Sequence, residues 1–335
     1  MVAAGSRANG IATKSVRAGS LLVLAMLLIS PALVAARPTV AQSAGDVVST
    51  GGMPMGMAFD PSEGRLFVAT ASAVVVTDGS ARVIDSIPAS EFMQFPCNLV
   101  YVPSAHEVFV ANCGGDGVSS LTVIDPCTDT IVGTVLLKEQ PFGIAYDSNT
   151  NQVFVADSSG MVSVVDVQTL QVVKTIAVPS GYYGVLFDPD TNEVYVSNAD
   201  NGTVSVISDR SYSVVATVKV GGFPMGMGLD TAKGLVLVAN FLDGTVSAIA
   251  EGNHSVVKTV WVGWLPSGVA VDSSTGVAYV SNGANYSMVE LDTSTLSATQ
   301  SFSIGSTLGA PLFVPETGQV YVPCVTTGEV VVFAP

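Results

Sequence analysis

Short apolar runs alternate with turn-forming residues along the chain, and the alternation recurs at a nearly fixed spacing. A Gly-centred phrase ending in Asp, such as PMGMAFD at 54–60 or PMGMGLD at 224–230, precedes a phrase such as VFVAD at 153–157 or VYVSN at 194–198. The aromatic residue or leucine at the second position of the latter phrase stands at 67, 109, 154, 195, 237, 279 and 321. Steps of 41 to 45 residues indicate a repeat array or a propeller.

Each repeat unit contains four segments with the pattern of β-strands. The third resembles TVSVI at 203–207 and the fourth resembles SVVATVKV at 213–220, both rich in Val and Thr and bounded by turn residues. Seven such units predict an all-β, seven-bladed β-propeller over residues 45–335, with four antiparallel strands per blade. The last unit begins with TLGAPLF at 307–313 and stops after its third strand. We therefore expect DVVST at 46–50 to supply its outer strand and close the ring.

The series VYVSN…GTVSVI…SVVATVKVGGFPMGMGLD resembles the YVTN-type propeller repeat of secreted bacterial proteins and archaeal surface-layer proteins. The resemblance covers the chain after residue 44 and implies the propeller fold and a place outside the cytoplasm. Propellers of this kind serve many functions, so it implies no particular activity.

The N-terminal 44 residues differ from the rest, with four basic residues and no acidic one. They contain the apolar run LLVLAMLLISPALVA at 21–35, followed by small residues. This order predicts a signal peptide over 1–36, with cleavage between 36 and 44. An uncleaved anchor is the alternative, but the run is shorter than the roughly 20 residues of a membrane-spanning helix. We expect a secreted protein, periplasmic, extracellular or on the cell surface, without membrane insertion after cleavage.

Charge narrows the range of partners. The chain is 48% hydrophobic and only 12% charged, and after residue 44 eight basic residues stand against 27 acidic ones. A net charge of −19 repels phosphate backbones and anionic lipid surfaces. We therefore expect no nucleic-acid partner.

The chain has four cysteines, and two of them flank a predicted hairpin. Cys97 and Cys113 lie at equal distances from a turn centred near Ala105, which also places Tyr101 opposite Phe109. Cross-strand spacing of this kind fits a disulfide, and secretion permits oxidation. The other two are expected to be free: Cys127 and Cys324.

The repeated PMGM phrase suggests either a metal-binding site or close packing of neighbouring strands. Met55 and Met57, with Met225 and Met227, could supply thioethers to a soft metal such as Cu(I). In a strand, however, Met55 and Met57 would share one face and the glycines the other, so that neighbouring inner strands could pack closely. Packing is the favoured interpretation.

A propeller blade presents two sets of loops, which we call the top and the bottom. Acidic residues on predicted top loops could form a shallow cation site, although Asn-Gly and Asp-Gly turn chemistry explains them as well: Asp116, Asp157, Asp200 and Asp243. Both histidines after residue 44, His106 and His254, map to the bottom, as do Arg65, Arg82 and Arg210. We therefore assign no catalytic residue and predict no cofactor.

Aromatic residues on the predicted top loops are suited to binding. They are Phe95, Tyr182, Phe223, Phe241, Trp264 and Tyr286. Three sequons, at Asn201, Asn253 and Asn285, lie on predicted loops and are candidates for glycosylation. The sequence thus favours a non-catalytic binding or cell-surface scaffold module whose partner is a protein or a glycan. Alternatives are a propeller hydrolase or lyase of lactonase type and a metal or redox accessory protein.

Overall fold

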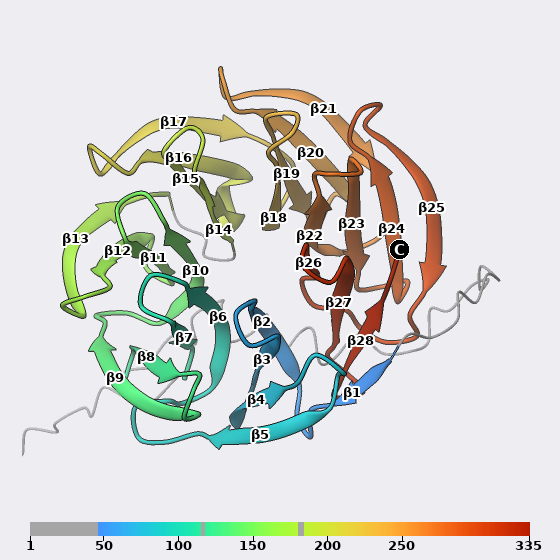
Figure 1. The fold of residues 1–335 in the computed structure, drawn as a ribbon. Coiled ribbons are helices and arrows are strands. Elements are labelled where there is room, and N and C mark those ends of the chain that lie inside the picture. The colour runs from blue at the N-terminus through green and yellow to red at the C-terminus, as the bar shows by residue number, and fades with distance from the viewer. Residues whose placement is uncertain (1–45, 115–117, 180–183) are drawn as a thin grey trace, which may run out of the picture. The chain divides into compact units, whose positions relative to one another are not determined.

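Seven four-stranded antiparallel sheets are arranged in a ring (Figure 1). The computed structural model describes residues 46–114, 118–179 and 184–335. The chain runs around the ring blade by blade, so the colours of Figure 1 pass in order from blue to red. The predicted seven-bladed propeller is confirmed.

Each blade begins with its innermost strand. Blade 1 comprises β2 (Pro54–Asp60), β3 (Arg65–Thr70), β4 (Ala73–Thr77) and β5 (Val83–Pro88). Blade 2 comprises β6 (Pro96–Val102), β7 (Glu107–Asn112), β8 (Ser120–Asp125) and β9 (Thr130–Leu136). Blade 3 comprises β10 (Pro141–Asp147), β11 (Gln152–Asp157), β12 (Met161–Asp166) and β13 (Gln171–Ala177). Blade 4 comprises β14 (Val185–Asp188), β15 (Glu193–Asn198), the 3-10 turn η1 (Ala199–Asn201), β16 (Thr203–Ser208) and β17 (Ser213–Lys219).

The remaining blades follow the same plan. Blade 5 comprises β18 (Pro224–Asp230), β19 (Leu235–Asn240), β20 (Thr245–Ala250) and β21 (Ser255–Trp261). Blade 6 comprises β22 (Pro266–Asp272), β23 (Val277–Asn282), β24 (Ser287–Asp292) and β25 (Ser297–Ser303). Blade 7 comprises β26 (Leu312–Val314), β27 (Gln319–Cys324), β28 (Glu329–Phe333) and β1 (Val47–Ser49). Its inner strand is shorter than the expected 307–313, since Pro311 has no N–H to donate and only an isolated bridge, Leu308 to Cys324, precedes it.

The first described strand completes the last blade, as predicted. β1 pairs antiparallel with β28, with Val48 opposite Val330 and Ser49 opposite Glu329. Val48 is almost fully buried and packs among Tyr321, Val330 and residues of blade 1. The ring therefore closes through side-chain burial as well as backbone pairing.

The core lies between the blades, and the repeated VxVxN-like phrases supply it. The aromatic residues that set the repeat period, among them Phe67, Phe109, Phe154 and Tyr195, are fully buried. One hydrophobic cluster, for example, joins Tyr195 of blade 4 to Val236 of blade 5. Because each blade buries both faces against its neighbours, the second and third strands are mostly buried, whereas the outer strands are mostly exposed to solvent.

The glycines of the repeated PMGM phrase allow neighbouring inner strands to pack closely. A Cβ on Gly56 would lie 2.7 Å from the Cα of Asn98, and one on Gly226 would lie 2.8 Å from the Cα of Gly268. Glycine is thus required where neighbouring inner strands meet. The prediction that Met55 and Met57 share a face is wrong. A register shift between Pro54 and Met57 sends Met55 towards the blade 2 and 3 cluster and Met57 towards blades 7 and 1.

Repeated polar residues hold the turns at both ends of the blades. The aspartates that close the inner strands accept backbone hydrogen bonds from the following turn, as from Ser62 N to Asp60 Oδ1 at 2.9 Å and Asn149 N to Asp147 Oδ1 at 2.8 Å. The asparagines that close the second strands fix the connections between blades. Asn240 Oδ1, for instance, accepts from Gly221 N at 3.0 Å.

The disulfide Cys97–Cys113 is present, but the register predicted for it is wrong. Tyr101 pairs with Val108, not with Phe109, and the pairing shifts between Pro96 and Asn98. Cys97 is the extra residue of that bulge, which brings its Cα within 5.9 Å of the Cα of Cys113. The two other cysteines are free, as predicted: Cys127 is exposed and Cys324 is buried. Burial raises the pKa of the Cys324 thiol to about 11, which makes it unreactive near neutral pH.

Candidate binding face

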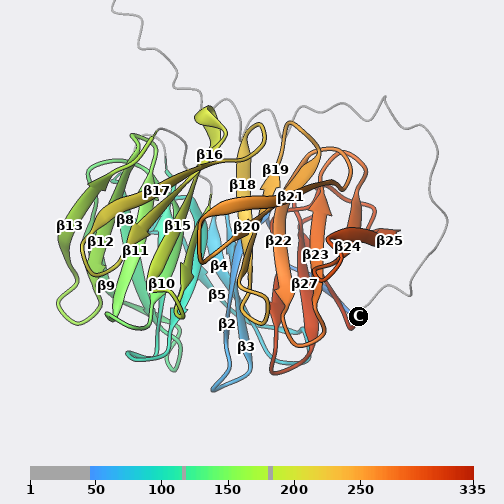
Figure 2. The ribbon, with the colours of Figure 1, turned by 90° about the horizontal axis from the view of Figure 1, so that it is seen from above.

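Each blade presents its loops at two ends (Figure 2). The top end carries the turns between second and third strands and the connections between blades. The bottom end carries the turns between first and second strands and between third and fourth strands. His254, in the bottom turn between β20 and β21, contacts Glu193 across the blade boundary at 3.0 Å. His106 lies in the bottom turn between β6 and β7. Both histidines thus lie where the sequence analysis placed them.

Two tryptophans dominate the top end of blades 5 and 6. Trp261 ends β21 and Trp264 lies in the connection to β22, with 50% and 59% of their surfaces exposed. Their ring centroids are 5.7 Å apart and the rings stand nearly perpendicular, at 74°. Edge-to-face pairing of this kind steadies two large apolar surfaces in water.

The residues between the tryptophans explain why both face solvent. Val262 is buried, and its carbonyl accepts a hydrogen bond from Asn282 Nδ2 at 2.9 Å. Gly263 follows with a φ of 126°, a conformation that L side chains rarely adopt. The buried valine anchors the segment, and the glycine turns the chain so that Trp264 comes back beside Trp261.

A groove of about 510 Å³ lies next to Trp261, between the outer parts of blades 5 and 6. One wall is the segment 261–263, and the other is formed by Asn285, Ser287, Val289 and the stretch 298–301 of β25. None of the lining residues is charged. The groove therefore combines an aromatic edge with amide and hydroxyl groups, and the exposed Asn285 lies at its rim.

The other aromatic candidates are spread around the top end. Phe223 and Phe241 contact each other within blade 5, with centroids 6.0 Å apart, and Phe241 is buried. Phe95 packs against the core cluster of blades 2 and 3. Tyr286 is half-buried beside the groove residue Asn285. Tyr182 lies outside the described residues.

Sequence reasoning did not single out Trp261, which ends the outer strand β21 and does not lie in a loop. The available signal was the spacing of WVGW at 261–264, where Val and Gly separate two tryptophans at the predicted end of a strand. Of the two tryptophans, only Trp264 was among the aromatic residues expected to face a partner.

The predicted acidic residues of the top end belong to separate blades. Asp157 is buried, and its Oδ1 accepts from Ser159 N at 2.8 Å and Met161 N at 3.2 Å. Asp243 accepts from Gly222 N at 2.6 Å, and Asp200 is exposed in η1. Asp116 lies outside the described residues. The contacts of Asp157 and Asp243 are those of turn and loop residues, and the cation site stays a hypothesis.

The three sequon asparagines are all exposed. Asn201 and Asn285 lie at the top end, in η1 and in the turn before β24, whereas Asn253 lies in the bottom turn before β21. Their use stays a prediction.

Among the residues that the structure describes, no helix has the length and apolar character to cross a bilayer. No model of a known protein family matches the chain, and no relative is found among the curated proteins searched. The chain is a seven-bladed β-propeller with an exposed groove, lined by Trp261, between blades 5 and 6.

Proposed function

We propose that this protein is a secreted, non-catalytic binding module that holds an uncharged glycan in the groove between the outer parts of blades 5 and 6, next to Trp261. The observation that carries the proposal is the composition of the groove, where the exposed indole of Trp261, paired with that of Trp264, adjoins amide and hydroxyl groups and none of the lining residues is charged. Sugar rings offer apolar C–H faces that stack on indoles and hydroxyls that pair with amides, so both kinds of group have a partner.

The distribution of titratable groups supports binding over catalysis. Both described histidines and the described arginines Arg65, Arg82 and Arg210 belong to bottom turns or strand ends. Proton transfer near neutral pH and oxyanion stabilisation are the tasks for which enzymes commonly use such side chains. The groove offers stacking surface and neutral hydrogen-bonding groups in their place.

The experiment is a panel of neutral oligosaccharides (β-glucan, chitin, mannan and xylan fragments) titrated calorimetrically into the purified protein. We expect at least one to bind, and Trp261→Ala and Trp264→Ala each to weaken it by about 10-fold, or about 1–2 kcal/mol. The matched control is Phe92→Ala, because Phe92 is also an exposed aromatic residue of a top connection but lies between blades 1 and 2.

Three results would contradict the proposal. One is the absence of any bound glycan. The second is equal affinity in the wild type and both tryptophan variants. The third is capture of a protein partner that Trp264→Ala abolishes, which would assign the face to a protein. Hydrolysis of a lactone or ester by the pure protein, lost in Asp157→Asn or Asp200→Asn, would instead support the enzyme alternative.

A further inference from the structure

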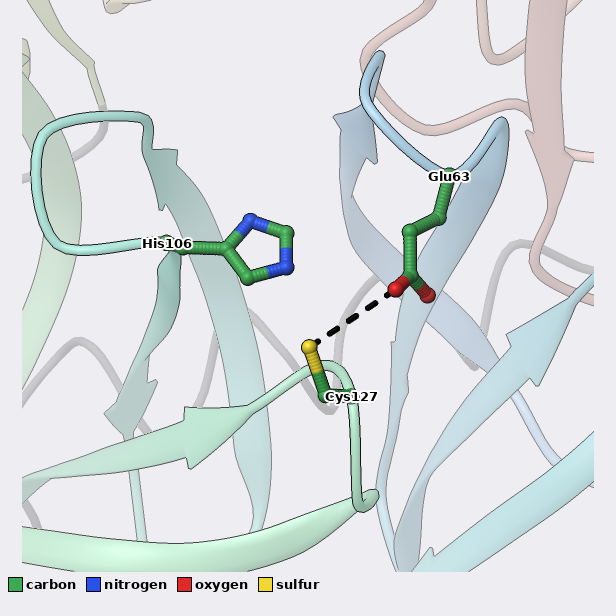
Figure 3. A group of neighbouring side chains, drawn as sticks. All are labelled: Glu63, His106 and Cys127. Carbon is green, nitrogen blue, oxygen red and sulfur yellow. Dashed lines mark hydrogen bonds between the residues drawn. The ribbon is translucent and has the colours of Figure 1, made fainter.

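Three side chains with different metal-binding groups meet at the bottom end, at the boundary of blades 1 and 2. Glu63 comes from the turn between β2 and β3, His106 from the turn between β6 and β7, and Cys127 from the turn between β8 and β9. One potential ligand atom from each lies within 4.8 Å of the others. Figure 3 shows the carboxylate, imidazole and thiol pointing towards one another. Within the described residues this is the only such group of three.

The imidazole is held by contacts that leave one nitrogen available. His106 Nδ1 lies 2.7 Å from the hydroxyl of Tyr101, and the two rings meet edge to face at 89°. Ser62 Oγ lies 3.4 Å from the same nitrogen. Metal-binding histidines usually engage their second nitrogen in this way, which fixes the tautomer and the ring orientation. Nε2 is then the atom directed at the thiol and the carboxylate.

Arg65 holds the carboxylate of Glu63 close to the turn that carries Cys127. Arg65 Nε contacts Glu63 Oε2 at 3.0 Å, and its guanidinium donates to the carbonyl of Pro126 at 2.7 Å. It also contacts Asp129 at 3.3 Å. Arg65 therefore ties the carboxylate to the turn that carries Cys127, whose Sγ lies 3.7 Å from Glu63 Oε1. These links leave Oε1 facing the cluster.

We propose that Glu63, His106 and Cys127 bind a single Zn²⁺ ion that joins blade 1 to blade 2. Thiolate, imidazole and carboxylate are the three ligand types that zinc accepts, at about 2.0–2.3 Å. Hard cations such as Mg²⁺ and Ca²⁺ prefer oxygen ligands alone, and Cu(I) prefers sulfur and nitrogen.

The proposed geometry needs only small movements of exposed turns. Ligand atoms around a tetrahedral zinc ion are roughly 3.5 Å apart. The potential ligand atoms of the three side chains lie within 4.8 Å of one another, so they need to approach only slightly. Thiolate and carboxylate together neutralise the charge of the ion, and binding displaces the thiol proton of Cys127. Three protein ligands leave the fourth position to water or to an outside donor.

The test uses the full-length protein, stripped of metal with a chelator, with two free thiols per chain verified under denaturing conditions and the disulfide intact. ZnCl₂ is titrated by calorimetry, and CoCl₂ serves as an optical probe. We expect one metal ion per chain and a near-ultraviolet thiolate-to-cobalt band. Cys127→Ser, which alters an exposed side chain, should remove the band and weaken zinc binding roughly 100-fold.

Matched variants separate this site from scattered weak binding. His106→Asn and Glu63→Gln should weaken zinc binding to a similar degree, whereas His254→Asn and Cys324→Ser should leave it unchanged. Tyr101→Phe, which keeps all three ligands, should weaken it by about 10-fold. No zinc binding to the stripped wild type would overturn the proposal, and so would zinc binding by Cys127→Ser and His106→Asn that is as tight as that of the wild type. Because the groove lies on other blades, either result leaves the glycan proposal unaffected.

Discussion

Cys97 and Cys113 are joined although neither is the cross-strand partner of the other. Cys97 is the unpaired residue of a bulge, and Cys113 follows the residue that pairs with Pro96. Along the hairpin, Cys113 lies one position beyond the partner of Pro96, whereas Cys97 lies one position on the other side of Pro96. The extra residue of the bulge lets the two side chains meet despite this offset. It also turns the disulfide towards Pro141 of blade 3, whose carbonyl lies 2.8 Å from Cys113 Sγ.

Removing this bridge should destabilise the fold measurably. The double variant Cys97→Ser, Cys113→Ser opens a loop with a sequence separation of 16, for which chain entropy predicts a loss of about 3 kcal/mol. Urea unfolding of the variant against the wild type measures it. Cys324→Ser, which removes a buried free thiol, controls for the effect of serine substitution. An unchanged midpoint in the double variant would show that the bridge does not constrain the unfolded chain.

The closing strand allows a test with neighbouring residues. Val48→Ala should lower the free energy of unfolding by about 1–3 kcal/mol, since Val48 packs inside the cluster that blades 7 and 1 share. Val47→Ala should cost less than about 0.5 kcal/mol, because Val47 is 49% exposed. Urea denaturation of both variants gives the comparison. Equal free energies of unfolding would mean that β1 is not part of the cooperative unit.

The inner-strand glycines should not tolerate a methyl group. Gly226→Ala places a Cβ 2.8 Å from the Cα of Gly268 and 3.0 Å from the carbonyl of Ser267, and neither backbone atom can move freely. We expect a loss of about 1–3 kcal/mol. Gly252→Ala is the control, as a Cβ there meets nothing within 4 Å. Thermal unfolding of the two variants should differ by several degrees, and identical curves would contradict the close approach of the strands.

Glu251 should make stability depend on pH. Burial, together with the negative charges of Asp188, Asp190, Glu193 and Asp230, raises the pKa of Glu251 to about 7. Between about pH 4.5 and pH 7 the folded state keeps a proton that the unfolded state releases, so this group makes stability fall as the pH rises through that window.

The variant Glu251→Gln removes this penalty. Relative to the wild type, it should gain about 1 kcal/mol at pH 8 and almost nothing at pH 4.5, a gain kept small because the side chain is partly exposed to solvent. Urea unfolding at the two pH values provides the measurement. If the variant and the wild type have equal free energies of unfolding at both pH values, solvent screens the charges of the neighbouring acids.

The ring itself could be predicted because every blade repeats the same local chemistry. Period-2 apolar patterning, Asp at the end of inner strands and Asn at the end of second strands recur at 41 to 45 residues, and each feature has a local physical cause. The pairing of DVVST with EVVVF followed from counting strands. Bulges could not be predicted, because they depend on how neighbouring inner strands crowd together. They account for the errors at Tyr101 and at Met55.

The candidate sites were harder to predict than the fold. His106 was expected at the bottom end and Cys127 was expected to be free, but Glu63 belongs to the preceding blade, and only the packing of the two blades brings it close. Likewise, Trp261 gains its role from Gly263, whose left-handed backbone returns Trp264 to its side. The Glu63 arrangement depends on contacts between blades, which spacing within one repeat does not encode, whereas the pairing of Trp261 with Trp264 depends on the local backbone conformation of Gly263.

The pairing of Val48 with Val330 also has a kinetic consequence. Synthesis proceeds from the N-terminus, so β1 is made early but cannot pair until β28 has been made. Blade 7 is therefore the last blade to assemble. Joining segments about 280 residues apart would cost on the order of 5 kcal/mol of chain entropy if they met first, but much less once six folded blades hold them close. After closure, detachment of β1 and detachment of β28 both require the pairing between these two strands to break. Unfolding forces and exopeptidases acting on the two ends therefore meet one shared barrier.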